Sequence, residues 1–380
     1  MRRPRLLELL VLVGGAFVAG GLLARVRRPR ASPPIVVVDA APEASVEAGP
    51  YDAPREADAA EAEVAPGFTV DDDELPFTPP DSTDPAVLAA LVPLGVRDEA
   101  SLAAARALLG PYIAHANQGN PAITTHSIDR ATCKARLQGV VLQTPLDRKI
   151  CGGPFEVAIH HGAPDQATTC IDVFEFPNRP CVVPFVYSYA LVAAQLCGLT
   201  GKRLCTQEEW IDACEADPKG GAPRAYAYGD ALDLEACHTG KTRAASCDVD
   251  KALWASCPTE TAPSGSYPRC RSRLGVFDQH GNVAEAMIRR EAGVNYVQLK
   301  GSAWFYDGKM YPDTCRFDPR WHVDTIDRSF HTNYHLGFRC CRSVVPLAQR
   351  SNPVKDAGVP EVEAAVVDED PYATDDAGGD

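Results

Sequence analysis

The sequence predicts an α+β domain that is rich in disulfides and contains little regular secondary structure. Short apolar runs separated by Gly, Pro, Asn and Asp are typical of short strands joined by long loops; examples are GVVLQT (139–144), FEVAIH (155–160), IDVFEF (171–176) and NYVQLKG (295–301). Two helices are indicated, one over 207–216, where Thr206 precedes two glutamates as a capping residue, and one over 188–196. All 14 cysteines lie between Cys133 and Cys341.

The number of cysteines indicates the compartment. A reducing cytosol rarely holds so many thiols unless they bind metal, and the sequence has no CxxC or CxxxxC pair of the kind that structural zinc needs. We therefore expect disulfides and an extracytoplasmic location; buried free cysteines are the alternative. Disulfides suit a loop-rich domain because each one lowers the entropy of the unfolded chain, which stabilises the fold by ~2–4 kcal/mol.

The net charge of −14 is carried by the ends of the chain. Residues 31–90 contain 14 Asp and Glu against one Arg, residues 352–380 contain nine against one Lys, and residues 1–30 contain seven Arg against one Glu. The middle of the chain is therefore close to neutral. Because a nucleic-acid-binding protein needs a basic face to neutralise phosphates, we expect no nucleic-acid partner.

Residues 1–30 have the pattern of a membrane anchor. The run 6–24 holds 19 residues with a single charge, Glu8, and a helix of that length rises about 28 Å, close to the hydrocarbon thickness of a bilayer. Arginines flank both ends, so the positive-inside rule does not decide the orientation, and the cysteines place the domain on the oxidising side. We expect N-terminal membrane association; a cleaved signal sequence, which leaves the protein secreted, is the alternative.

Three further segments accompany the cysteine-rich domain, which spans 131–350. Residues 31–83 form an acidic, Ala/Pro-rich disordered stalk, because this composition buries too little apolar surface to offset the entropy of ordering. Residues 84–130 are predicted to be helical, and residues 351–380 to be an acidic disordered tail. Both acidic segments are interpreted as solvated spacers; calcium capture by residues 71–74 is the alternative.

Common catalytic signatures are absent from the sequence, which has no GxGxxG, GxxxxGK[ST], HExxH or GxSxG motif. Two pairs of histidines are candidate metal ligands by residue type alone: His160 with His161, and His331 with His335. Isolated histidines are more often core or surface groups. A different metal chemistry would require histidines and carboxylates to converge in one cleft; the candidates are His322, His331, His335, Asp313 and Asp318.

Six blocks of the sequence follow one another in a characteristic order: CIDVFEFPN (170–178), SYALVAAQLCGLTGKRLCTQEEWIDAC (188–214), YAYGDAL (226–232), LGVFDQHGNVAEAM (274–287), LKGSAW (299–304) and HLGFRCCR (335–342). In this order they resemble the formylglycine-generating enzyme (sulfatase-modifying factor) family, whose pattern includes GKRLPTEAEWE, GNVWEW, GGSW and GFR. The resemblance covers roughly 155–342. It implies a variant C-type-lectin-like fold, with a small mixed sheet, few helices and much loop.

The resemblance also implies a chemistry, which this sequence does not support. Oxidases of the family convert a cysteine of a sulfatase to formylglycine with copper and oxygen, and two cysteine thiolates, five residues apart and soon after the GGS block, hold copper(I). With Gly301 and Ser302 matched to that block and Cys315 to a downstream cysteine, the copper positions fall on Phe305 and Met310. Neither is a thiol, so copper is not expected. Four residues are expected to line the family cleft: Ser302, Trp304, Tyr306 and Tyr311.

The same resemblance implies two disulfides, Cys197–Cys340 and Cys214–Cys315. The other ten cysteines lie outside the family pattern, and the sequence does not fix their connectivity. Neighbours along the chain suggest four pairs and leave Cys205 for Cys341; the four are Cys133–Cys151, Cys170–Cys181, Cys237–Cys247 and Cys257–Cys270.

A structural calcium ion is implied for the loop that matches GNVWEW. Asp278 and Glu285 match its side-chain ligands, and Gly281 and Val283 match its carbonyl ligands. Hard oxygen ligands of this kind suit Ca²⁺. Asn282 is expected to order the turn. The alternative is an ordinary loop with two solvated carboxylates.

Together these observations predict an exported sulfatase-modifying-factor-like domain without copper-dependent cysteine oxidase activity. We expect it to act as a binding or structural module of the cell envelope, with a protein or envelope ligand. The alternative is an enzyme of the same type that modifies a protein or peptide through an altered metal site; a role in envelope assembly is a third. Free thiols in the cleft would favour copper oxidation, and we expect none.

Overall fold

The computed structural model describes residues 67–70, 122–244, 256–320 and 324–350, with residues 100, 103–104, 107–108, 120 and 247 as isolated positions. The chain divides into two units, Met1–Ala62 and Glu63–Asp380, and every described residue belongs to the second. The predicted anchor (1–30), the tail (351–380), and most of the stalk and of the 84–130 segment therefore lie outside the described residues. No helix within the described ranges has the length and apolar character needed to cross a bilayer.

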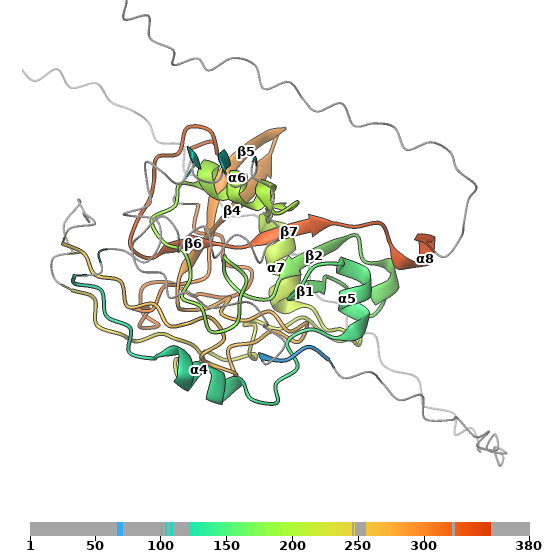
Figure 1. Ribbon diagram of the computed structural model, residues 1–380, viewed down its shortest axis with the longest axis horizontal. Coiled ribbons are helices and arrows are strands. Elements are labelled where there is room, and N and C mark those ends of the chain that lie inside the picture. Colours follow the sequence, from blue (N-terminus) through green and yellow to red (C-terminus); the bar gives the residue numbers. More distant parts are fainter. Residues whose placement is uncertain are drawn as a thin grey trace, which may run out of the picture. The chain divides into compact units, whose positions relative to one another are not determined.

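Two small sheets form the framework of the domain (Figure 1). The first is antiparallel, with strands in the order β1 (Glu156–Ala158), β2 (Thr169–Asp172), β7 (Cys340–Ser343) and β3 (Arg203–Leu204). The second has the order β5 (Val294–Lys300), β4 (Ala284–Glu291) and β6 (Leu336–Phe338); β4 pairs antiparallel with β5 and parallel with β6. Because the strands are short and long loops join them, the predicted α+β class with little regular structure is confirmed.

The described helices are also short: α4 (Arg130–Leu137), α5 (Pro145–Cys151), the 3-10 turn η3 (Pro164–Gln166), α6 (Ala190–Leu199), α7 (Gln207–Glu215) and α8 (Leu347–Arg350). Helix α7 begins where the sequence predicted, after Thr206. The Thr206 hydroxyl accepts a hydrogen bond from the Glu209 amide at 3.3 Å, and the Glu209 carboxylate accepts one from the Thr206 amide at 2.8 Å. This reciprocal capping satisfies two amides that the helix leaves unpaired.

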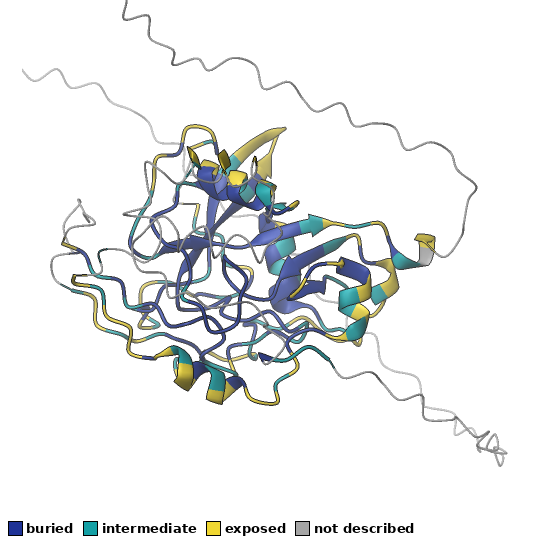
Figure 2. Ribbon diagram, in the orientation of Figure 1, coloured by how far each residue is buried: buried dark blue, intermediate teal, exposed yellow. Residues whose placement is uncertain are grey.

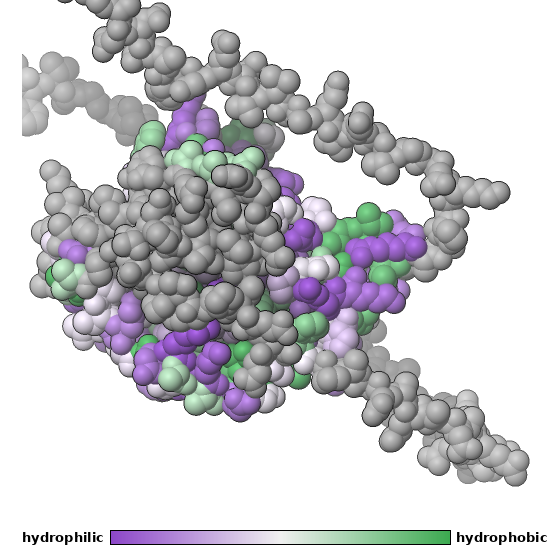
Figure 3. All heavy atoms as spheres, viewed as in Figure 1, coloured by the Kyte–Doolittle hydropathy of each residue, from purple (hydrophilic) through white to green (hydrophobic). Residues whose placement is uncertain are grey.

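Helix α7 joins the two sheets. It packs against β2 of the first sheet and against β4 and β5 of the second. Its Trp210 is fully buried, and the indole nitrogen donates a hydrogen bond to Glu285 on β4 at 3.0 Å. Most strand residues are buried, as the dark blue ribbon in Figure 2 shows, whereas residues 290–295, where β4 turns into β5, are exposed. On the face drawn in Figure 3, hydrophilic and hydrophobic residues are interspersed over the described surface.

All 14 cysteines form seven disulfides, so the chain has no free thiol. Both bridges that the family resemblance implied are present, Cys197–Cys340 and Cys214–Cys315, as is Cys205–Cys341. The four pairs inferred from neighbours along the chain were wrong; the structure has Cys133–Cys181, Cys151–Cys170, Cys237–Cys270 and Cys247–Cys257. Seven disulfides are typical of an extracytoplasmic protein.

The physical reason for the wrong pairs is tertiary packing. Helix α4 packs beside the 263–264 segment, where the Cys133 sulfur lies 3.6 Å from the Ser264 carbonyl oxygen. The Cys181 amide donates to the same carbonyl at 3.0 Å, which brings Cys133 to Cys181 rather than to Cys151. Cys151 ends α5, which packs on β1 and β2, and it therefore meets Cys170 of β2.

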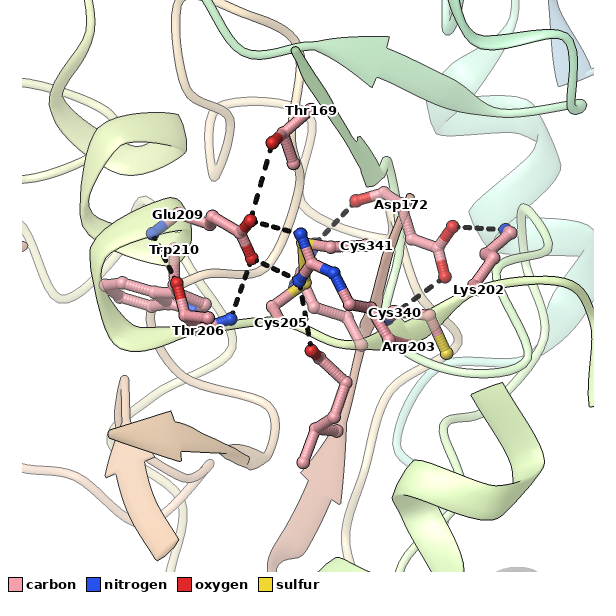
Figure 4. The surroundings of a disulfide bond; sticks show 12 residues. Thr169, Asp172, Lys202, Arg203, Cys205, Thr206, Glu209, Trp210, Cys340 and Cys341 are labelled. Atoms are coloured by element: carbon pink, nitrogen blue, oxygen red, sulfur yellow. Dashed lines mark hydrogen bonds and ion pairs between the residues drawn. A yellow bond between two sulfur atoms is a disulfide. The ribbon is translucent and has the colours of Figure 1, made fainter. Parts of the chain in front are cut away.

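The adjacent Cys340 and Cys341 illustrate strand geometry. Successive residues of a strand point to opposite faces. Cys340 accordingly joins Cys197 of α6 in one core cluster, whereas Cys341 joins Cys205 in another. Figure 4 shows the second bridge, beside which the Arg203 guanidinium faces the carboxylate of Glu209.

Candidate functional site

A cavity at the edge of the second sheet has a volume of about 360 Å³. Its walls come from the start of β4, the end of β5, the loop that follows β5, and the segment that leads into β6. The described residues that line it are Arg243, Ala284, Leu299, Lys300, Gly301, Ala303, Phe305, Met310, Tyr311, Phe317, Pro319, His331, Asn333 and His335. We call this cavity the β5 pocket.

Both residues at the family's copper positions line the β5 pocket. The Phe305 ring is half-buried, and it contacts the rings of Trp304 and His335 with centroids 5.5 and 5.1 Å away. Met310 is 57 % exposed at the mouth. An aromatic ring and a thioether thus occupy the cleft positions at which the resemblance required thiolates.

Of the four predicted cleft residues, the structure places only Tyr311 in the pocket wall. Ser302, Trp304 and Tyr306 are buried beneath it. The Ser302 hydroxyl accepts a hydrogen bond from the Gly281 amide at 2.9 Å, and the Tyr306 hydroxyl donates to the Tyr311 carbonyl. Residues 301, 303 and 305 line the cavity, whereas residues 302, 304 and 306 are buried; the chain turns here, with Gly301 at a φ of +69° and a hydrogen bond of 2.9 Å from the Tyr306 amide to the Ala303 carbonyl.

The histidines of the pocket could not be placed from the sequence alone. His331 and His335 both line the cavity, 331 exposed and 335 half-buried. The His335 Nδ1 atom is buried and has no hydrogen-bond partner, and burial lowers the pKa of this imidazole to about 3. His335 is therefore neutral at physiological pH and carries one N–H that can be donated.

The predicted alternative of histidines converging with carboxylates is not met among the described residues. Asp313 is buried and accepts a hydrogen bond from the His280 ring at 3.1 Å. Asp318 accepts one from Arg320 at 2.7 Å. His322 lies outside the described residues. No carboxylate is among the described residues that line the β5 pocket.

The first histidine pair lies elsewhere, before η3. His161 is 3.8 Å from the carboxylate of Asp212, and both side chains are about half exposed. The His160 Nδ1 atom is buried without a partner, and burial lowers the pKa of this ring. Neither residue lines the β5 pocket.

Lys300 is the buried cation beside the pocket. Its ammonium donates to the carbonyl oxygens of Cys315, at 2.8 Å, and Phe317, and it lies 5.0 Å from the centre of the Trp210 ring. Burial lowers the pKa of this amine to about 8. The ammonium thus holds the 315–317 segment, which forms one wall of the pocket, against β5.

Of the predicted calcium ligands, Asp278, Gly281 and Val283 lie in the buried loop before β4, and Glu285 is the second residue of β4. The Asp278 carboxylate accepts a hydrogen bond from the Gly265 amide at 2.6 Å. Glu285 accepts two from the Arg339 guanidinium, one of them at 2.6 Å, and a third from Trp210. Both oxygens of Glu285 are therefore already paired with donors. Gly281 has a φ of +73°, and a Cβ there would come within 2.5 Å of the His238 carbonyl oxygen, so only glycine fits.

Sequence reasoning missed the third carboxylate of this loop region, Glu175. It accepts hydrogen bonds from Ser264, Asn282 and the Val283 amide at 2.8, 2.8 and 3.3 Å. Burial, reinforced by Asp278 and Glu285, raises its pKa well above the ordinary value. Burial also raises the pKa of Asp278, to about 7. Asn282 orders the turn by exchanging hydrogen bonds with Ala262, as expected.

A second missed cluster surrounds the Cys214–Cys315 disulfide. The His280 ring lies 3.4 Å from the Cys214 sulfur, donates to Asp313 and accepts from the Ala227 amide at 3.1 Å. These two cysteines and His280 form the one set of three metal-ligand atoms within 4.8 Å of one another among the described residues. Because both sulfurs are in the disulfide, they are not thiolates and do not hold a metal.

Residues 186–344 match the family model of the sulfatase-modifying factor enzyme 1-like domain. The resemblance predicted from the sequence blocks is thereby confirmed over residues 186–344. The match includes α6, α7, both sheets except β1 and β2, and all described residues of the β5 pocket. It begins after the CIDVFEFPN block at 170–178, which carried part of the predicted resemblance.

Similarity to individual known proteins is low. No curated protein matches the sequence. Among solved structures, CarF is 15 % identical, with 43 % of this chain and 68 % of that chain covered and a TM-score of 0.28. The P3c variant of the Major Tropism Determinant is 11 % identical, with 51 % and 54 % covered and a TM-score of 0.25; its M1 variant is 11 % identical, with 53 % and 48 % covered and a TM-score of 0.21. At these identities and TM-scores the similarity says nothing about function.

Proposed function

We propose that this sulfatase-modifying-factor-like domain is a ligand-binding module and not a copper-dependent cysteine oxidase, with the β5 pocket as its binding site. The observation that carries the proposal is the cysteine inventory. All 14 cysteines are in disulfides, and the two positions matched to the family's copper ligands are Phe305 and Met310 on the pocket wall. Copper(I) is selected by soft thiolate ligands, and a disulfide sulfur is not a thiolate.

The pocket itself has the character of a small-molecule site. Such sites are concave, mostly apolar and roughly 300–1,000 Å³ in volume, with a few polar groups that orient the ligand. At about 360 Å³ the β5 pocket falls in this range, and most of its described walls are aliphatic or aromatic. Disulfides hold the surrounding loops, so the site is largely formed before a ligand arrives.

An activity assay tests the proposal. The chain, purified from an oxidising expression host, is incubated with copper, oxygen, a thiol reductant and a peptide bearing the CxPSR sulfatase motif, and the peptide is weighed by mass spectrometry. We expect no conversion of cysteine to the aldehyde beside a working oxidase of the family. Conversion above the no-protein control would refute the proposal. The matched variant, F305C/M310C, restores the two thiols and should retain copper(I) on a desalting column where the parent chain does not.

A second candidate function rests on the histidines. His331, His335 and Met310 line the same cavity, and imidazole and thioether groups are copper ligands. An enzyme with an altered metal site, acting on a protein or peptide, would use these residues. Equilibrium dialysis against copper distinguishes the candidates: one equivalent bound by the parent and lost in His335→Phe supports the enzyme, and equal, substoichiometric binding by both opposes it.

Calcium remains a proposal for the loop that contains Asp278. Three buried carboxyl groups, Glu175, Asp278 and Glu285, face a single guanidinium, Arg339, and burial raises the pKa of the first two; a bound cation would stabilise their ionised forms. The pairing of Glu285 with Arg339 opposes its use as a ligand, so an ion would rely on Asp278 and on carbonyls of the 281–283 turn. Thermal unfolding in Ca²⁺ and in a chelator decides: a higher Tm in Ca²⁺ that Asp278→Asn abolishes supports the site.

Three finer predictions complete the proposal. The variant C-type-lectin-like fold is supported by the two small sheets, the few helices and the long loops. Export to the cell envelope is supported by the seven disulfides; the membrane-anchored and secreted forms are distinguished by fractionating cells that express the full chain. The partner is proposed to be a protein or envelope ligand and not a nucleic acid.

A further inference from the structure

The charged groups among the described lining residues of the β5 pocket carry a single sign. Both charged side chains among its described lining residues are cationic, Arg243 and Lys300, and neither Asp nor Glu is among them. The neutral imidazole of His335 offers an N–H, and its Nδ1 atom is buried without a partner. An anion that enters this cavity meets donors and positive charge, whereas a cation meets no compensating carboxylate.

The position of Arg243 links this charge to the apolar walls. Its guanidinium lies 5.1 Å from the centre of the Phe305 ring, at the exposed side of the cavity. Arg243 therefore lies over one aromatic wall, where its N–H groups can reach a carboxylate at the mouth. The Lys300 ammonium donates hydrogen bonds to two backbone carbonyls. We therefore expect it to attract an anionic ligand through its positive charge and not through a direct hydrogen bond.

The aromatic and aliphatic walls of the pocket favour a flat, apolar group in the rest of the ligand. Phe305 and His335 form one aromatic contact at 5.1 Å, and Tyr311 and Phe317 form another, with rings stacked at 5.1 Å and an angle of 10° between their planes. Three buried residues that also line the pocket are apolar: Ala284 of β4, Leu299 of β5 and Ala303 of the loop after β5. Aromatic faces of this kind pack best against a flat, apolar group.

We propose that the β5 pocket binds a small aromatic monocarboxylate, with its ring system between the aromatic walls and its carboxylate at Arg243 and His335. This inference deepens the proposed binding function and depends on it. The peptide assay separately tests whether the domain lacks oxidase activity, so a failure to bind the aromatic acid and the presence of oxidase activity are distinguished. No bond is made or broken in the proposed step.

Isothermal titration of the full chain with matched probes tests the proposal. The probes share one ring system: 2-naphthoate, the neutral 2-naphthylmethanol and the cationic 2-naphthylmethylamine. We expect 2-naphthoate to bind with one equivalent per chain, at least about tenfold more tightly than the alcohol, with no measurable binding of the amine, because one charge-assisted hydrogen bond is worth about a factor of ten or more. Equal affinity for acid and alcohol, or tighter binding of the amine, would overturn the proposal, as would no binding of any probe.

Two variants assign the site. Arg243→Gln should weaken 2-naphthoate binding about tenfold and leave the weak binding of the alcohol unchanged, because only the carboxylate contacts the guanidinium. Arg328→Gln is the matched control: Arg328 is 84 % exposed and does not line the pocket, so its loss should change neither affinity. Equal effects of the two substitutions would show that long-range charge, and not this pocket, attracts the acid.

Discussion

The two disulfides that end on adjacent residues of β7 should be energetically coupled. Cys197–Cys340 spans 143 residues and Cys205–Cys341 spans 136, so each alone would close a long loop. While one bridge is intact, however, the other closes only a small ring of roughly nine residues, made of the segments 197–205 and 340–341. Removing the second bridge should then lower the free energy of unfolding by ~2.6 kcal/mol. Loop entropy therefore predicts that the bridges partly substitute for each other.

Removing both bridges has a larger cost. Once Cys205–Cys341 is gone, the remaining bridge Cys197–Cys340 closes a loop that runs through Cys214–Cys315 and holds roughly 42 residues. Removing it as well should lower the free energy of unfolding by a further ~3.9 kcal/mol. The double loss should then exceed the sum of the two single losses by ~1.3 kcal/mol. The two bridges lie in different core clusters, so each pair of substitutions loses side-chain packing in its own cluster.

Four proteins measure this coupling: the parent, C197A/C340A, C205A/C341A, and the quadruple variant, none of which contains an unpaired thiol. Guanidinium unfolding in sodium sulfate, which strengthens the folded state, gives the free energy of unfolding of each. The reasoning fails if the quadruple variant loses no more than the sum of the two pairs, or if either pair alone loses the ~5 kcal/mol expected for its full loop.

Three further predictions follow from single residues. Thr206→Ala should lower the free energy of unfolding by ~1 kcal/mol because it removes the cap of α7, and Thr206→Ser should restore most of it; equal urea midpoints for Ala and Ser would contradict the capping role. Burial lowers the pKa of His238 to about 4, below the value of about 6.5 in the unfolded chain, so between pH 6.5 and 4 the unfolded state binds a proton that the folded state does not. As the pH is lowered through this range, the free energy of unfolding decreases by up to ~1.4 kcal/mol per pH unit. His238→Gln should remove that part of the slope, and an unchanged pH profile would show that His238 is not its source. Gly281→Ala should cost more than Gly240→Ala by ~1–3 kcal/mol, because both have positive φ but only at 281 does a Cβ collide with backbone; similar Tm values for the two variants would count against this close approach.

Local features of the fold could be read from the sequence. The Thr206 cap and the acidic first turn determine where α7 begins, because capping depends on residues within one helical turn. The short strands in the 155–160 and 295–301 runs follow from short apolar runs and the breakers that flank them. The order of the sequence blocks was sufficient to identify the family and, from it, two of the seven disulfides.

Tertiary structure alone decided the features that depend on distant contacts. Cys133 pairs with Cys181 because α4 packs beside the 263–264 segment, a proximity that no sequence spacing encodes. Ser302 and Trp304 are buried while Phe305 lines the cavity, because contacts with distant segments decide which side chains of the loop after β5 point into the core. Arg339 meets Glu285 only when β4 and β6 pair, which turns a predicted calcium ligand into the partner of a buried guanidinium. The sequence by itself thus determined the local elements, the family and the loss of the thiolate pair, whereas long-range packing determined the shape, charge and lining of the pocket, because those properties arise where segments far apart in the chain come together.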